Sequence, residues 1–127
     1  MVEHIISMNR ELKFRVYNPD KQQMMYFDIH NIWFADRYLC QDKYPVQQYT
    51  GLKDSTEKEI YEGDILKISY GAMGDVIGQV LYEADHGGYI FQWERKGPNQ
   101  NYINLNCDVA FESVIVGNIF ENPELLN

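Results

Sequence analysis

The fold is decided by residues 46–67, which read VQQYTGLKDSTEKEIYEGDILK. Val46–Thr50 has the β-branched and aromatic content of a strand, and we expect this strand to stop at Gly51. The polar residues 53–59 are typical of an exposed turn. Gly63 follows this turn, and glycine can take the positive φ that other residues resist. A second strand then begins near Ile65. The segment therefore predicts two strands and the turn between them.

The residues before this segment predict a β-hairpin. Leu12–Tyr17 alternates with a period of two, and its basic residues lie on the side away from Val16. Residues 18–20, Asn-Pro-Asp, supply turn chemistry, and Met24–Ile29 is apolar enough to return as the partner strand. Residues 31–44 favour a short helix and a strand equally.

The residues after the segment predict more short strands and a final helical turn. Strands are expected over residues 76–82, 89–94 and 114–120, with glycine-containing turns between them. Asn122 can cap a helical turn and Pro123 suits its first position, so that this turn would carry Leu125 and Leu126 onto the sheets. About six short strands predict a mostly β fold: a small barrel or two packed antiparallel sheets, of SH3 or OB size.

The composition indicates one soluble, acidic domain. The chain has 127 residues, of which 45% are apolar and 14% aromatic, as in a globular protein. Its net charge of -8 arises entirely after Gly51, because residues 1–50 carry equal numbers of bases and acids. No stretch of the sequence has the clustered Lys and Arg of a protein that binds duplex DNA, so nucleic acid is not the favoured partner. The acidic charge favours a basic partner. A membrane partner is not expected either.

The two cysteines indicate a reducing compartment. Cys40 and Cys107 are far apart in the sequence, and neither lies in a CxxC motif or near a histidine. We expect reduced thiols that pack inside the protein in preference to a disulfide or a pair of metal ligands. The sequence also lacks an apolar run of the ~18 residues that a membrane-spanning helix needs.

Known catalytic and cofactor motifs do not match the chain. His4, His30 and His86 are too dispersed for zinc-ligand spacing, and His86 is interpreted as a hairpin-turn residue. Residues 71–74 contain two glycines but lack the pattern of a Walker or Rossmann loop, so we interpret them as a plain loop. We therefore expect no cofactor and no metal.

Four acidic residues lie close together around the second turn. They could hold a hard cation or supply paired carboxylates, but their spacing does not fit the calcium-loop pattern, and a solvated face is the favoured interpretation. These residues are Glu57, Glu59, Glu62 and Asp64.

Aromatic residues are the other chemical resource of the chain. Small barrels of the OB or SH3 type stack bases or bind proline-rich peptides on such rings, although packing is the favoured role for any single ring. The residues considered are Tyr49, Tyr61, Tyr70, Tyr82, Tyr89, Phe91, Trp93 and Tyr102.

Two stretches in the middle of the chain carry a family resemblance. Residues 46–54 and 58–67 together resemble the central signature of the YopX-like proteins of temperate phages and prophages of Gram-positive bacteria. Residues 11–17 and 116–125 resemble the two ends of that family. The resemblance implies a phage-encoded, mostly β protein in the cytoplasm of the host bacterium, with no established biochemical role and no catalytic residues.

The resemblance also marks motif positions and boundaries. It implies a single domain over residues 8–127, preceded by a poorly ordered extension at residues 1–7. Where the family often has Asn-Gly, this chain has Ser55-Thr56-Glu57, so it lacks the residues that a tight two-residue turn prefers. The motif positions, expected to determine the fold or an interaction, are Tyr49, Gly51, Leu52, Asp54, Tyr61, Glu62, Gly63, Asp64, Gly117, Asn118, Asn122 and Pro123.

Three functional hypotheses follow from the sequence. The favoured one is a non-enzymatic module that binds a phage or host protein; exposed strand edges would also allow a homo-oligomer. The alternative is association with nucleic acid, either as a single-strand binder that uses Arg10, Lys13 and Arg15 or as an acidic DNA mimic. The least favoured is an enzyme whose site assembles only in space, for example around Glu62, Asp64 and His86.

Overall fold

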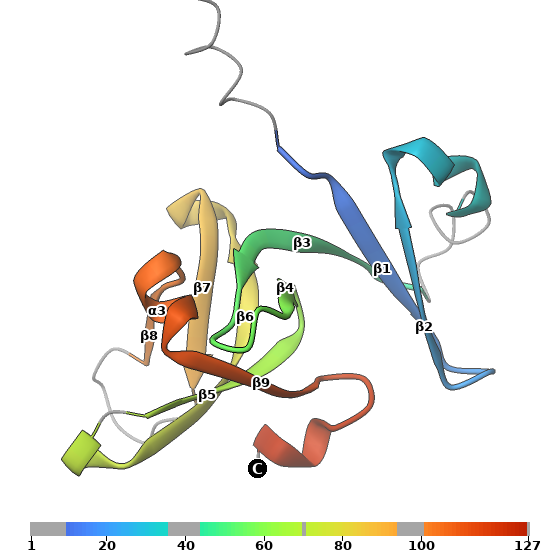
Figure 1. Cartoon of the computed structure of the whole chain (residues 1–127). Coiled ribbons are helices and arrows are strands. Elements are labelled where there is room, and N and C mark those ends of the chain that lie inside the picture. The colour runs from blue at the N-terminus through green and yellow to red at the C-terminus, as the bar shows by residue number, and fades with distance from the viewer. Residues whose placement is uncertain (1–9, 36–43, 70, 94–100, 127) are drawn as a thin grey trace, which may run out of the picture.

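The chain forms two antiparallel sheets, as predicted (Figure 1). A computed structural model describes residues 10–35, 44–69, 71–93 and 101–126, which contain nine strands. The first sheet has the strand order β2-β1-β3-β4, made of β1 Lys13–Asn18, β2 Gln23–Asp28, β3 Val46–Lys53 and β4 Glu59–Tyr61. The second has the order β8-β7-β6-β5-β9, made of β5 Asp64–Ser69, β6 Asp75–Glu83, β7 Gly88–Trp93, β8 Tyr102–Asn104 and β9 Ser113–Asn118.

Short helical segments connect several of these strands. The segment that could be helix or strand begins with a 3-10 helix, and its residues 36–43 lie outside the described residues. The sequence did not predict β4, β8 or α3, each of which is only a few residues long, so residues 46–67 begin three strands and not the two expected. The helical segments are η1 Ile29–Ala35, η2 Gly71–Met73, η3 Ala84–His86, α3 Cys107–Phe111 and η4 Pro123–Leu126.

The predicted N-terminal hairpin is confirmed, but one of its faces was misassigned. β1 and β2 pair in register, and the Asn18 side chain accepts hydrogen bonds from the backbone of the turn. The alternation predicted that the basic side of β1 faces solvent. Arg15 lies on that side and is only 3% exposed, so both sides of β1 are covered in the folded protein.

Strand β3 continues past the residue at which it was expected to stop. Gly51 lies within β3 with φ +87°, and the pairing with β4 is irregular between Tyr49 and Lys53. A glycine in this conformation is typical of a β-bulge, which bends the strand instead of ending it. The first part of β3 pairs with β1, and its last part pairs with β4 beside the second sheet (Figure 1).

The hydrophobic core has two separate parts. The smaller cluster lies on the first sheet, where Val16, Phe27 and Tyr44 are buried. The larger cluster fills the concave side of the second sheet, beneath α3 and β4. Its buried members are Ile60, Leu66, Ile68, Val80, Phe91, Leu105 and Ala110.

The predicted C-terminal turn is confirmed with one correction. η4 packs against β6, and Leu125 and Leu126 are partly buried. The Asn122 side chain does not cap η4: its Oδ1 accepts a hydrogen bond from the Asn118 backbone N–H at 3.2 Å, which closes the preceding turn.

Other sequence predictions concern the ends and the cysteines. Residues 1–7 and Cys40 lie outside the described residues. Cys107 is a free thiol, as expected, but it is exposed at the start of α3 and not packed inside the protein. No helix among the described residues is long and apolar enough to cross a membrane.

Candidate functional site

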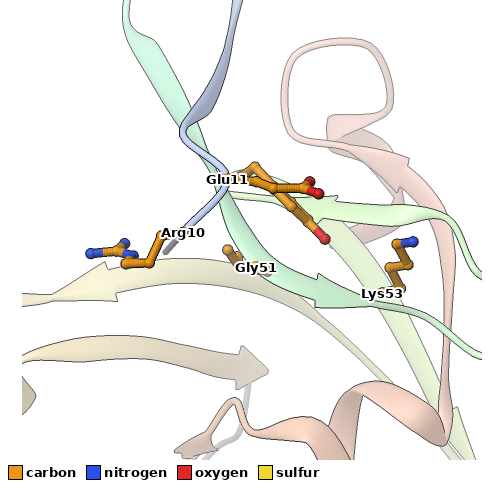
Figure 2. A pocket seen from close by; sticks show the side chains of 6 residues that line it. Arg10, Glu11, Gly51 and Lys53 are labelled. Carbon is orange, nitrogen blue, oxygen red and sulfur yellow. The ribbon is translucent and has the colours of Figure 1, made fainter. Parts of the chain in front are cut away.

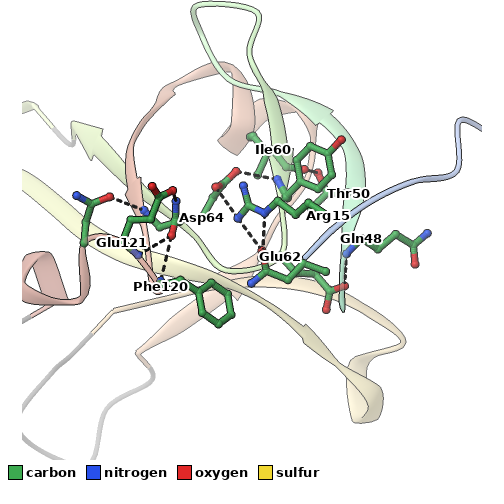
Figure 3. Close-up of polar contacts among 12 residues, drawn as sticks. Arg15, Gln48, Thr50, Ile60, Glu62, Asp64, Phe120 and Glu121 are labelled. Atoms are coloured by element: carbon green, nitrogen blue, oxygen red, sulfur yellow. Dashed lines mark hydrogen bonds and ion pairs between the residues drawn. The ribbon is translucent and has the colours of Figure 1, made fainter. Parts of the chain in front are cut away.

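A buried ion pair lies where the two sheets meet. Arg15 on β1 and Asp64 at the start of β5 approach to 2.9 Å, and both side chains are 4% exposed (Figure 3). Arg15 also donates to Gln47 Oε1 at 2.6 Å and to the Glu62 carbonyl at 3.0 Å. Asp64 Oδ2 accepts from the Tyr61 N–H at 2.8 Å. This polar junction, formed by the five residues named here, ties β1, β3 and the β4–β5 turn together.

The electrostatics of the polar junction indicate a structural role. Burial raises the pKa of the Asp64 carboxyl, while the Arg15 guanidinium and the Tyr61 N–H oppose that rise. The guanidinium lies 4.9 Å from the centre of the Tyr61 ring, and burial raises the pKa of Tyr61 to about 12. Each charge is therefore already satisfied inside the protein, which suits a permanent contact between strands.

The four acidic residues considered as a cluster have separate environments. Glu57 is exposed, as expected for a solvated face, whereas Asp64 is buried and corrects that interpretation. Glu59 binds Lys13 at 2.6 Å, and Glu62 Oε1 accepts from the Gln48 N–H at 2.8 Å. Within the described residues no group of three or more His, Cys, Asp or Glu side chains could hold a metal ion.

The turn between β3 and β4 is built on Asp54. Its Oδ1 accepts hydrogen bonds from the Thr56 N–H, the Thr56 hydroxyl and the Lys58 N–H, and its Oδ2 accepts one from the Ile115 N–H. Burial alone would raise the pKa of Asp54, but these four hydrogen bonds outweigh it and lower the pKa. The stretch predicted as an exposed turn therefore contains a buried carboxylate that covers the edge of β9.

Several motif positions make packing or hydrogen-bond contacts within the fold. Tyr49 and Tyr61 pack with ring centroids 5.6 Å apart, and Leu52 packs on the larger core cluster. Asn118 Oδ1 accepts from the N–H groups of Phe120 and Glu121, which shapes the turn before η4. Gly117 packs closely against the Asn122 side chain in this turn. Pro123 is the first residue of η4.

Gly63 has the tightest surroundings of the motif glycines. It has φ +84°, and a Cβ placed on it would overlap the Gln47 amide. Its N–H donates to the Val80 carbonyl, and its carbonyl accepts from the Ile119 N–H. The residue therefore lies between the polar junction and the second sheet, where no side chain fits.

Several cavities lie beside the first sheet in the described part of the chain, and two of them are lined by motif positions. The junction cavity, of about 350 Å³, is lined by Arg15, Tyr26, Tyr61, Asp64 and residues of β4 and β9. The Gly51 cavity, of about 360 Å³, has the side chains of Arg10 and Lys53 on either side of Gly51 (Figure 2).

The largest of the described cavities, about 530 Å³, opens beside the turn between β6 and β7. We call it the tyrosine cavity: it is lined by Arg10, Gln48, Glu62, Tyr82, Gly87, Gly88 and Tyr89. The Tyr82 and Tyr89 rings meet edge to face with centroids 5.5 Å apart. Burial raises the pKa of the Glu62 carboxyl. Burial and the nearby Glu62 charge also raise the pKa of the Tyr89 hydroxyl, while the positive charge of Arg10 opposes that rise.

The structure does not bring the three residues of the enzyme hypothesis into one cavity. Asp64 lines the junction cavity, whereas Glu62 lines the tyrosine cavity. His86 is an exposed turn residue, as predicted, and its ring meets the edge of the Tyr102 ring at 5.1 Å.

The sequence marked Tyr61, Glu62 and Asp64 of the polar junction as motif positions, but it did not indicate Gln47 or that Arg15 is their buried partner. Arg15 was considered only as a base that could contact nucleic acid. The available signal was that Arg15 lies in the middle of a strand, between Phe14 and Val16. Its partner Asp64 is 49 positions away in the sequence, so the pairing itself had no local signal. A packing role is borne out for Tyr49, Tyr61 and Phe91, which are all buried, while Tyr70 lies outside the described residues.

The fold and its motif positions define a small β protein whose two sheets meet at a buried charge pair. Residues 13–127 match the family model described as YopX protein, and over that extent the chain belongs to the YopX family. The resemblance noted in the sequence is thereby confirmed. No curated protein matches the chain.

One solved structure supports the fold. The crystal structure of protein EF1440 from Enterococcus faecalis is similar with a TM-score of 0.58. The two chains are 21% identical, and the match covers 94% of this chain and 100% of that one. At this identity the likeness shows a shared fold.

Proposed function

We propose that this chain is a non-enzymatic, phage-encoded module that binds a basic surface of another protein, of phage or host, in the cytoplasm of the infected bacterium. The supporting observation is the charge of the described surface after Gly51, where exposed acids outnumber exposed bases. The acids are Glu57, Asp75, Asp85, Asp108, Glu112, Glu121 and Glu124, and the bases are Lys53, Lys58 and Lys67.

The bases of the first sheet support a protein partner over nucleic acid. Arg15 is buried against Asp64, and Lys13 binds Glu11 at 3.1 Å and Glu59 at 2.6 Å. The hydrogen bonds to Glu59 and Glu11 raise the pKa of Lys13, so it stays charged and engaged. Two of the three bases proposed for single-strand binding therefore have acidic partners within the protein.

An acidic DNA mimic is a special case of the same proposal. Such a module would occupy the basic groove of a DNA-binding protein, and the acidic surface suits it equally. A mimic and a module for another basic surface differ in one property, which is whether duplex DNA competes for the partner.

The test is capture of a partner from lysate of infected cells on the immobilised chain. We expect saturable binding that free chain competes away and that salt weakens. The control is the variant with Asp85→Asn, Asp108→Asn and Glu112→Gln, which removes exposed charges and should bind more weakly.

Two further measurements complete the test. Fluorescence anisotropy of a labelled single strand and a labelled duplex should show no binding; binding that falls steeply with salt would favour the nucleic-acid alternative. Release of the captured partner by duplex DNA would identify a mimic. Absence of any saturable partner would overturn the proposal.

A further inference from the structure

We propose that the tyrosine cavity receives an arginine side chain of the partner protein, with Glu62 as the residue that binds its charge. This inference rests on the proposed function and assigns it a contact site. It is carried by the chemistry and the unused hydrogen-bonding capacity of the groups that line the cavity.

The tyrosine cavity has polar groups that no other described residue engages. Glu62 uses Oε1 to accept from the Gln48 N–H, and Oε2 accepts no hydrogen bond from a described residue. The Gln48 side-chain amide and the hydroxyls of Tyr82 and Tyr89 likewise form none within the described part of the chain. Convergent polar groups with free capacity are what a ligand site requires.

The junction cavity provides the contrast. Its Arg15 and Asp64 bind each other, and its Glu59 binds Lys13. A ligand entering there would have to break hydrogen bonds that stabilise the fold. The comparison therefore favours the tyrosine cavity as the place where a partner's group gains new contacts.

The chemistry of the lining favours a guanidinium. Tyr82 is 53% exposed, so its ring is accessible to a cation, and the Glu62 carboxylate supplies the opposite charge. The Gln48 side chain also lines this cavity. A carboxylate near an accessible aromatic ring suits arginine better than lysine, because the planar guanidinium can stack on the ring while its N–H groups bind the carboxylate.

The wall at the β6–β7 turn is open. Gly87 and Gly88 carry no side chain, and a Cβ added to either would meet nothing within 4 Å. A partner's side chain therefore has a clear approach beside this turn.

Arg10 lines the same cavity, so the charge of the ligand can be tested. Its positive charge would repel an arginine ligand, whereas an anionic ligand would use Arg10 and be repelled by Glu62. Removing each charge in turn therefore has opposite consequences for the two kinds of ligand.

The experiment is an NMR titration of the full chain with N-acetyl-arginine amide, which follows the Gly87 and Gly88 amide signals. We expect saturable shifts with an affinity in roughly the millimolar range, because one side chain supplies few contacts. The neutral, nearly isosteric N-acetyl-citrulline amide should bind about tenfold more weakly, since it lacks the charge. Equal binding of the two probes would overturn the proposal.

Two variants test the residues. Glu62→Gln should weaken binding of the arginine probe about tenfold, while its amide oxygen can still accept from the Gln48 N–H and maintain the fold. Arg10→Ala should leave binding unchanged or tighten it. Weaker binding by Arg10→Ala, or tighter binding of N-acetyl-glutamate amide than of the arginine probe, would overturn the proposal.

Tyr82→Ala is the second route, because this exposed ring can be removed with little effect on folding. It should weaken binding of the arginine probe about fivefold by loss of the cation–π contact.

If the wild type captures a saturable partner but does not bind the probe, the cavity assignment fails alone. If capture fails, the proposed function fails, whatever the probe does.

Discussion

The two sheets of this protein are stabilised in different ways. The second sheet encloses a large apolar cluster around Leu66, Val80 and Phe91. The first sheet has a small cluster of three buried residues, and its contact with the rest of the protein includes the buried pair Arg15–Asp64. Since stability scales with buried apolar area, the second sheet has the larger reserve. The position of the first sheet depends more strongly on a few polar contacts.

The largest expected effect is loss of the polar junction. Arg15→Met leaves Asp64 as an uncompensated buried charge, which should cost about 4 kcal/mol of unfolding free energy. Because the defect lies at the first sheet, amide hydrogen exchange should increase in β1 and β2 more than in β5–β7. Denaturant unfolding and exchange mass spectrometry measure the two effects.

A double variant shows whether charge or shape matters at this position. Arg15→Met combined with Asp64→Leu removes both charges and should be more stable than Arg15→Met alone. It should not reach wild type, because the Tyr61 N–H and the Gln47 side chain lose their partners. A single variant within about 1 kcal/mol of wild type would show that the polar junction does not hold the first sheet.

The turn at Asp54 is the second polar contact to break. Asp54→Ala removes an acceptor of four hydrogen bonds and uncovers the edge of β9, so it should cost about 3 kcal/mol. The loss of stability should extend to the second sheet, because the Ile115 N–H of β9 loses its acceptor. In this respect Asp54→Ala should differ from Arg15→Met. Exchange protection in β9 is the measurement that separates the two variants.

The pH dependence of this contribution has a defined sign. Because the pKa of Asp54 lies below its ordinary value of 3.8, its stabilisation is complete above that value and is lost as the pH falls through the lowered pKa. The difference in unfolding free energy between wild type and Asp54→Asn should therefore shrink below about pH 4. A difference that stays constant down to pH 2 would contradict the assignment.

These contacts also show which parts of the structure the sequence could predict. Strands β1, β2, β5, β6, β7 and β9 follow from apolar alternation and turn residues, which are local signals. β4, β8 and α3 are too short for such a signal, and they depend for their stability on packing against the rest of the fold. Local patterns identify the elements that build a core by themselves.

The polar junction and the tyrosine cavity could not be predicted in the same way. The alternation of β1 separates its two sides, but it does not say that the β4–β5 turn covers the side of Arg15. The tyrosine cavity likewise joins Gln48 and Glu62 to Tyr82 and Tyr89 across separate strands. Both depend on contacts between distant positions, which a single sequence does not reveal.

Two glycines with the same backbone geometry test how much the polar junction adds to local strain. Gly51 and Gly63 have φ +87° and +84°, but only at Gly63 would a Cβ overlap the Gln47 amide. Gly51→Ala should cost about 1 kcal/mol from backbone strain, whereas Gly63→Ala should cost about 2 kcal/mol or more. Equal losses in denaturant unfolding would show that Gln47 moves aside freely and that its bond to Arg15 contributes little.

The smallest expected effect is a gain in stability at the turn between β3 and β4. Glu57 has φ +70°, a left-handed conformation that residues other than glycine resist. Glycine removes the strain of this conformation, and Glu57 is exposed, so little packing is lost. Glu57→Gly should raise the unfolding free energy by about 1 kcal/mol, which a thermal melt detects as a higher melting temperature.

Ser55→Gly is the matched control for this gain. Ser55 lies in the same turn but does not have a positive φ, and its backbone N–H donates to the Ser113 carbonyl at 2.9 Å. Glycine there only adds freedom to the unfolded chain, so stability should fall by about 0.5 kcal/mol. Opposite signs at two neighbouring positions would show that the strain resides at Glu57, whereas a loss at both would mean that Asp54 and its hydrogen bonds already offset it.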